Sequence, residues 1–95
     1  MLVRRVTGVS MEPSLYDGDI VITRRKTPKV GDVVIAKIDG REVIKRVKSY
    51  SPTALFLLGD NSDTSTDSRH YGEVPFTSLL GVVSFTFKKK WPFLD

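Results

Sequence analysis

A serine and a lysine are the residues of this sequence that could do covalent chemistry together. Ser10 lies in Gly8-Val9-Ser10-Met11-Glu12-Pro13, where glycine permits a close backbone approach and proline stiffens the exit. A serine hydroxyl becomes a nucleophile when a neighbouring base takes its proton, and a neutral lysine can be that base without a histidine. Each residue also has a simpler interpretation when it is considered alone. Ser10 could be an ordinary turn residue, and Lys45 could be a solvated lysine on an edge strand.

Lys45 is expected to be buried because of its place in a β-type run. Side chains alternate between the two faces of a strand, so Lys45 shares a face with Val43 and Val47. If these valines mark the buried face, loss of hydration lowers the pKa of Lys45 from about 10.4 toward neutrality. A neutral amine is then available as a general base.

Composition excludes several other kinds of site. The sequence has no cysteine and one histidine, which removes disulfides, a cysteine nucleophile, thiolate metal sites and histidine clusters. We therefore expect no metal and no cofactor. The net charge is +4, but the basic residues are scattered apart from Arg24-Arg25-Lys26 and Lys88-Lys89-Lys90, so nucleic acid is not the expected partner.

The pattern of β-branched residues predicts an all-β fold, and the length of 95 residues predicts a single domain over residues 1–95. Asp39-Gly40 separates two of the predicted strands and is a strong signal for a two-residue hairpin. The strands are expected at residues 2–9, 20–23, 33–38, 42–47, 54–58 and 80–87.

The segment from residue 59 to residue 75 is long, polar and without periodicity. A loop longer than about 12 to 15 residues in a small domain is usually functional or disordered. Asp67 and Arg69 could pair with opposite charges and hold it in place, and residues 71–75 return the chain to a core-like strand.

Several ordered blocks of this sequence resemble the type I signal peptidase family. The blocks are Gly8-Val9-Ser10-Met11-Glu12-Pro13-Ser14-Leu15, Gly18-Asp19-Ile20-Val21, Gly31-Asp32-Val33-Val34, Ile44-Lys45-Arg46-Val47, Gly59-Asp60-Asn61 and Asp67-Ser68-Arg69-His70-Tyr71-Gly72-Glu73-Val74-Pro75. The resemblance implies a small, partly open antiparallel β-barrel. It also implies a serine endopeptidase in which Ser10 is the nucleophile and Lys45 the general base.

The same resemblance implies roles for residues around the dyad. Ser65 matches the serine that orients the catalytic lysine, and Asp67 and Arg69 match an ion pair behind the site. Asp60 matches a carboxylate near the arginine that follows the lysine, here Arg46. A lysine base needs an acceptor that directs its ammonium group, and a long loop needs charged contacts to stay ordered.

The oxyanion of the tetrahedral intermediate needs hydrogen-bond donors. The backbone N–H of Ser10 is the candidate that the resemblance implies. Some members of the family add a hydroxyl two positions before the nucleophile, but that position is Gly8 here. The second donor is therefore left open.

The expected substrate is a protein precursor, bound as an extended peptide that adds a strand to a sheet edge. The compact sequence and Ser65-Thr66-Asp67-Ser68-Arg69 look like a small soluble branch of the family, the nickel-type superoxide dismutase maturation proteases. Three alternatives stay open: the catalytic part of a membrane-anchored general signal peptidase, a self-cleaving repressor, and a non-catalytic basic β-barrel that binds nucleic acid or protein.

No apolar run approaches the roughly 18 to 20 residues that span a bilayer, so we expect a soluble, cytoplasmic protein. If an N-terminal helix was removed, the expected place is the extracytoplasmic face of the membrane.

The last predicted strand and the C-terminal segment could each pack into the fold or form a binding surface. The segment Lys88-Lys89-Lys90-Trp91-Pro92-Phe93-Leu94 could contact an anionic membrane surface, or it could pack Trp91 and Phe93 onto the barrel. Val83, Phe85 and Phe87 share one strand face and are expected in the core rather than in a substrate platform. His70 is expected to be a loop residue without a catalytic role.

Overall fold

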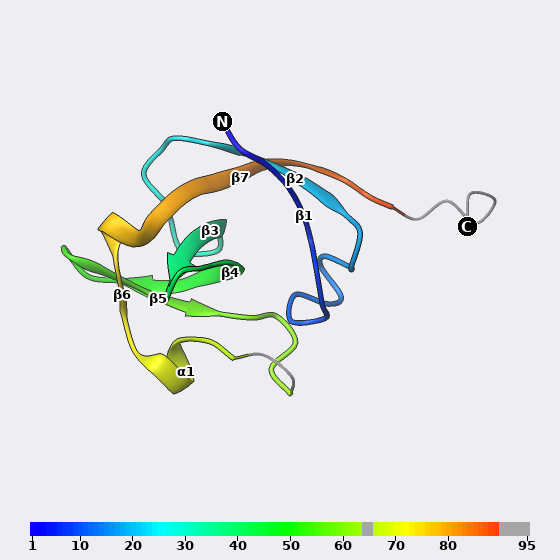
Figure 1. Cartoon of the computed structure of the whole chain (residues 1–95). Coiled ribbons are helices and arrows are strands. Elements are labelled where there is room, and N and C mark those ends of the chain that lie inside the picture. Colours follow the sequence, from blue (N-terminus) through cyan, green and yellow to red (C-terminus); the bar gives the residue numbers. More distant parts are fainter. Residues whose placement is uncertain (64–65, 90–95) are drawn as a thin grey trace.

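The fold is one curved antiparallel β-sheet, which the computed structural model describes for residues 1–63 and 66–89 (Figure 1). Its elements are β1 (Val3–Arg5), β2 (Ile20–Arg24), β3 (Val33–Ile38), β4 (Arg41–Tyr50), β5 (Ala54–Leu58), α1 (Ser68–Tyr71), β6 (Val74–Pro75), a 3₁₀ turn η1 (Phe76–Ser78) and β7 (Leu79–Phe87). The strand order is β1-β2-β7-β3-β4-β5-β6. Every neighbouring pair is antiparallel, which confirms the all-β prediction.

The hairpin of β3 and β4 is the one that Asp39-Gly40 predicts. Ile38 pairs with Arg41, and the two turn residues have positive φ angles of 50° and 78°, as this kind of tight hairpin turn requires. The resulting register places Lys45 opposite Val34. The face that Lys45 occupies is therefore set by the turn.

The sheet curls until its first strand meets a strand that is not its neighbour. Arg4 of β1 donates from Nε to Oε1 of Glu42 at 2.6 Å and from Nη2 to Oε2 at 3.1 Å, and Glu42 belongs to β4. The edge strands β1 and β6 remain at opposite ends of the strand order and do not pair. The sheet is therefore a small, partly open barrel, as expected.

Two apolar clusters lie on opposite faces of β3. Val34 and Ala36 contribute to one cluster, and Ile35 contributes to the other. The first cluster contains Val34, Ala36, Val47, Leu55, Leu57, Val74 and Val82, and the second contains Val6, Met11, Leu15, Val21 and Ile35. Since the second cluster includes residues on both sides of Ser10, burial of apolar side chains anchors the segment that carries it.

The polar segment of residues 59–75 contains more regular structure than the sequence predicts. Asp67 caps the short helix α1, and its carboxylate accepts the backbone N–H of Arg69 at 3.1 Å. His70 lies in this helix rather than in a loop, and its Nδ1 accepts the N–H of Asp67 at 3.4 Å. Val74 then pairs with Leu55. One turn of helix has too few residues to produce a periodic pattern, which is why the sequence did not reveal it.

Phe85 and Phe87 are not in the core, so the prediction for them is wrong. Their exposed fractions are 53% and 55%. Their rings pack edge to face, with the ring centroids 4.8 Å apart. Ile22 pairs with Phe85 while Thr23 pairs with Val83, so the pairing of β2 and β7 shifts by one residue there. A bulge of this kind bends its strand. Val83 consequently packs against the second cluster, whereas the residues beyond the bulge do not.

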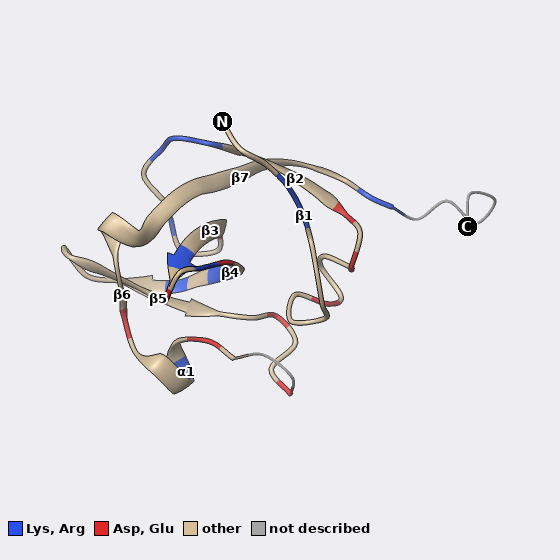
Figure 2. Ribbon diagram, in the orientation of Figure 1, with Lys and Arg blue, Asp and Glu red and all other residues tan. Residues whose placement is uncertain are grey.

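Positive charge is distributed over several elements instead of one. Figure 2 shows lysine and arginine on β1, in the turn after β2, on β4 and after β7. Arg4, Arg46 and Lys88 each form an ion pair with a carboxylate. Within the described ranges, no helix has the length and apolar character needed to cross a bilayer.

The placement of the core predicts different effects of truncation at two large apolar residues. Leu57 is fully buried, so Leu57→Ala should lower the free energy of unfolding by about 2 to 5 kcal/mol. Phe85→Ala removes a half-exposed ring and its edge-to-face contact with Phe87, so the free energy of unfolding should fall by only about 1 kcal/mol. Urea denaturation of both variants measures the difference. Equal losses would contradict the position of Phe85 outside the core.

Candidate active site

Ser10 lies in the turn after β1, and this turn is held from two sides. Met11 is 1% exposed and Leu15 is buried with it, and the N–H of Leu15 donates to the carbonyl of Met11 at 2.9 Å. From the other side, the backbone N–H of Asn61 donates to the Ser10 carbonyl at 2.9 Å, and its Nδ2 donates to the Val9 carbonyl at 3.1 Å. The Ser10 backbone is thus fixed between the core and the residue 59–69 segment.

Lys45 is buried, as the strand alternation predicts. Its exposed fraction is 5%, and Val34 opposite it and Val47 beside it are buried as well. Loss of hydration lowers the pKa of Lys45, the nearby carboxylate of Asp67 raises it, and the guanidinium of Arg69 lowers it. Burial outweighs the attraction of the carboxylate, so the amine gives up its proton more readily than a free lysine does.

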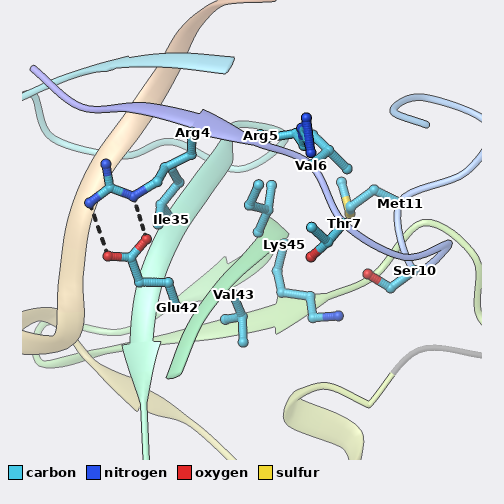
Figure 3. Close-up of a pocket in the computed structure, with 11 residues that line it drawn as sticks. Arg4, Arg5, Val6, Thr7, Ser10, Met11, Ile35, Glu42, Val43 and Lys45 are labelled. Carbon is cyan, nitrogen blue, oxygen red and sulfur yellow. Dashed lines mark hydrogen bonds and ion pairs between the residues drawn. The ribbon is translucent and has the colours of Figure 1, made fainter. Parts of the chain in front are cut away.

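Ser10 and Lys45 line the same cavity, which has a volume of about 320 Å³. One wall comes from β1 and the residues after it, and the other comes from β4. In Figure 3 the amine of Lys45 and the hydroxyl of Ser10 point toward one another, while the Arg4 and Glu42 ion pair lies at the other end of the cavity. The curl of the sheet therefore gives two residues far apart in the sequence a common space.

The carboxylate of Asp67 is fully buried behind this cavity and accepts several N–H groups. The N–H of Gly59 donates to it at 2.8 Å, and Arg69 donates from Nε at 3.0 Å and from Nη2 at 2.8 Å. The next residue, Ser68, accepts the N–H of Leu57 through its hydroxyl at 2.9 Å. A buried carboxylate is costly unless donors surround it. These contacts therefore join the end of β5 to the beginning of α1.

Arg46 and Asp60 form a second ion pair next to the site. Arg46 donates from Nε and Nη2 to the two carboxylate oxygens at 2.9 and 2.8 Å, and from Nη1 to the Gly31 carbonyl at 2.7 Å. The hydrogen bond from Arg46 lowers the pKa of Asp60 below its usual value. Among the described residues, no three His, Asp or Glu side chains gather where they could hold a metal ion.

Asn61 is a residue of this site that the sequence analysis did not assign a role. The sequence signal was its place in the Gly59-Asp60-Asn61 block, which carried the family resemblance without showing what the amide contacts. Ser65, which the resemblance pairs with Lys45, lies outside the described residues, so its role stays a prediction.

Gly8 has a backbone conformation that favours glycine, with φ at 81°. Its N–H donates to Oδ1 of Asp17 at 2.9 Å. This amide is therefore engaged within the turn that follows β1.

The chain after β7 is attached to the turn before β2. Lys88 Nζ lies 2.9 Å from Oδ2 of the buried Asp19, and the N–H of Lys89 donates to Oδ1 at 2.8 Å. Trp91 and Phe93 lie outside the described residues, so contact of the C-terminal segment with a membrane stays a prediction.

Sequence comparisons identify relatives over most of the chain. A family model described as Peptidase S24-like matches residues 1–83. Subunit 1 of the mitochondrial inner membrane protease of Mus musculus is 32% identical over 117 residues, which cover 94% of this chain and 69% of that protein. The Homo sapiens protein of the same name is 31% identical over the same shares. Signal peptidase I of Bacillus caldolyticus is 32% identical over 101 residues, which cover 96% of this chain and 54% of that protein.

The family model covers both walls of the cavity, with the turn that carries Ser10 and the strand that carries Lys45. The chain therefore belongs to the Peptidase S24-like family, a family of serine peptidases, and it is related to signal peptidase I.

Proposed function

We propose that Ser10 and Lys45 act as a catalytic dyad that hydrolyses a peptide bond in a protein precursor. The observation that carries this proposal is the shared cavity, in which a buried amine with a lowered pKa faces a serine hydroxyl (Figure 3). Burial keeps a fraction of the amine neutral at a pH where an exposed lysine is fully protonated. That is the property a general base needs.

The reaction then follows from the positions of the two groups. Lys45 takes the hydroxyl proton while the oxygen of Ser10 bonds to the scissile carbonyl carbon, and the carbonyl electron pair moves to its oxygen. The intermediate collapses, the C–N bond breaks, and the Lys45 ammonium returns the proton to the leaving amine. A water molecule, deprotonated by Lys45, attacks the acyl ester in the same way and releases Ser10 and a carboxylate product.

The substrate is proposed to bind as an extended segment beside β1. This strand is at an edge of the sheet, since β2 is its only neighbour in the strand order, and residues 4–7 line the cavity. An edge strand presents unpaired N–H and C=O groups that an extended peptide can bind. A peptide placed there would run past Ser10.

Removal of an N-terminal segment from a precursor is the activity that the relatives favour. Signal peptidase I and the mitochondrial inner membrane protease are peptidases by name. The compact chain resembles the nickel-type superoxide dismutase maturation proteases. This resemblance supports the precursor of nickel superoxide dismutase, with its propeptide, as one substrate. A secretory preprotein is the substrate expected of a general signal peptidase.

The polar segment of residues 59–69 is proposed to position the dyad. Asp67 and Arg69 hold its end behind Lys45, and Asn61 holds the carbonyls of Val9 and Ser10. These residues act through the backbone and through charge, so their loss should affect the geometry of the site more than its chemistry.

Cleavage by Ser10 is tested with two precursors. We expect the wild-type chain to cleave a secretory preprotein or a nickel superoxide dismutase precursor at one bond, and Ser10→Ala to cleave neither while melting at the wild-type temperature. Mass spectrometry of the new N-termini identifies the bond and the preferred precursor. Cleavage that persists in Ser10→Ala would exclude this nucleophile. A folded wild-type chain that cleaves neither would overturn the proposed function.

The proposed base predicts a pH dependence. The neutral fraction of Lys45 rises as the pH rises through its pKa, which burial holds below the ordinary value of 10.5. We therefore expect kcat/KM to increase with pH and to level off below pH 10.5, because only the neutral amine accepts the proton. Lys45→Met should fold and lose this activity. Lys48→Met, an exposed position on the same strand, should keep both the rate and the profile.

Asn61→Ala tests the anchoring of the Ser10 turn. The variant loses the hydrogen bond to the Val9 carbonyl but keeps the backbone bond to Ser10. Such a bond is worth about 0.5 to 1.5 kcal/mol, which corresponds to a decrease of up to about tenfold in kcat if it serves to position Ser10. KM should change little. Ser84→Ala, which removes a hydroxyl bonded to the Ile22 carbonyl away from the cavity, is the matched control. Equal kcat in the two variants would exclude a positioning role.

A further inference from the structure

We propose that Thr7 is a catalytic residue whose hydroxyl donates a hydrogen bond to the oxyanion of the tetrahedral intermediate. The proposal rests on the Ser10 and Lys45 reaction described above. When Ser10 attacks, the carbonyl oxygen becomes negatively charged, and donors aimed at that oxygen lower the barrier. The N–H of Ser10 is one candidate donor, and a second one has to come from the walls of the cavity.

The residue beside Thr7 does not supply this second donor. Gly8 has no side chain, and its N–H donates to Oδ1 of Asp17 at 2.9 Å. Arg4 is a charged donor in the same wall, but Nε and Nη2 donate to the two oxygens of Glu42 at the other end of the cavity (Figure 3). Thr7 carries a side-chain hydroxyl three residues before Ser10, in the same wall of the cavity.

Thr7 lines the cavity together with Ser10 and Lys45. Figure 3 shows its hydroxyl on the cavity side of the backbone, above the side chain of Lys45 and in the same part of the cavity as Ser10. Thr7 and Ser10 come from one wall and Lys45 from the opposite one. A scissile carbonyl attacked by Ser10 would therefore have the base on one side and the Thr7 hydroxyl on another.

The backbone on both sides of Thr7 is fixed before any substrate binds. The N–H of Val6 donates to the Asp19 carbonyl at 2.7 Å, and the Val6 carbonyl accepts the N–H of Gly18 at 2.8 Å. On the other side, Gly8 is bonded to Asp17. A hydroxyl on such a segment needs little reorganisation when the negative charge develops, which is the condition under which a donor contributes most to the rate.

Kinetics of three threonine variants test the proposal with the precursor that wild-type protein cleaves. Thr7→Val keeps the shape of the side chain and removes the hydroxyl, so kcat should fall on the order of 100-fold with little change in KM. Thr7→Ser keeps a hydroxyl and should recover most of the rate. Thr53→Val removes a hydroxyl at an exposed position that does not line the cavity, and it should behave as wild type. Thermal melting checks that all three variants are folded.

A pair of inhibitors separates oxyanion stabilisation from ordinary binding. A peptide aldehyde with the residues that precede the mapped cleavage site lets the Ser10 oxygen add to its carbonyl carbon, with the electron pair moving to the carbonyl oxygen and the serine proton to Lys45. The matching peptide alcohol cannot form this adduct. Thr7→Val should weaken inhibition by the aldehyde by a factor close to its loss in kcat, and it should leave inhibition by the alcohol unchanged.

Each outcome has a defined meaning. An unchanged kcat in Thr7→Val, or an equal loss of aldehyde and alcohol inhibition, would overturn the role of Thr7 while leaving the dyad in place. A Thr7→Ser variant as slow as Thr7→Val would overturn it too, because the hydroxyl would then not be the active group. Absence of cleavage by folded wild-type protein would overturn the dyad and, with it, this inference.

Discussion

The site depends on the loss of water around the amine of Lys45, which lowers its pKa by more than the nearby carboxylate of Asp67 raises it. The buried Val34 lies opposite Lys45 on β3 and the buried Val47 shares its strand, and only 5% of Lys45 remains exposed. Asp67 lies close enough to raise the pKa, but its carboxylate is already shared with Arg69, which acts in the opposite direction. The balance leaves the pKa lowered, and desolvation is the dominant cause.

The polar segment of residues 59–69 contributes to this balance from a distance. It begins at Gly59, whose N–H binds the Asp67 carboxylate, and Asn61 then binds the turn that carries Ser10. The same segment is therefore attached to the Ser10 turn at one point and to the surroundings of Lys45 at another. This double attachment gives a long polar segment a structural reason to be present in a small barrel.

Much of the fold could be predicted because it depends on local chemistry. The Asp39-Gly40 hairpin and the burial of Lys45 follow from turn preferences and from alternation along one strand, and both are confirmed. The exposure of Phe85 could not be predicted, because it depends on a bulge in the pairing with another strand. The helix α1 was missed since its stability comes from the Asp67 cap and not from a repeated pattern.

The sequence by itself determined the chemical types and the family resemblance: a serine in a rigid turn, a lysine on a strand, and ordered blocks shared with peptidases. Only the tertiary structure decided which groups meet. It placed Ser10, Lys45 and Thr7 around one cavity. It also connected Asn61 to the Ser10 turn and directed the N–H of Gly8 to the carboxylate of Asp17. The physical reason is that pKa shifts, directed donors and a shared cavity arise from contacts between distant segments, and these contacts exist only after the sheet has curled.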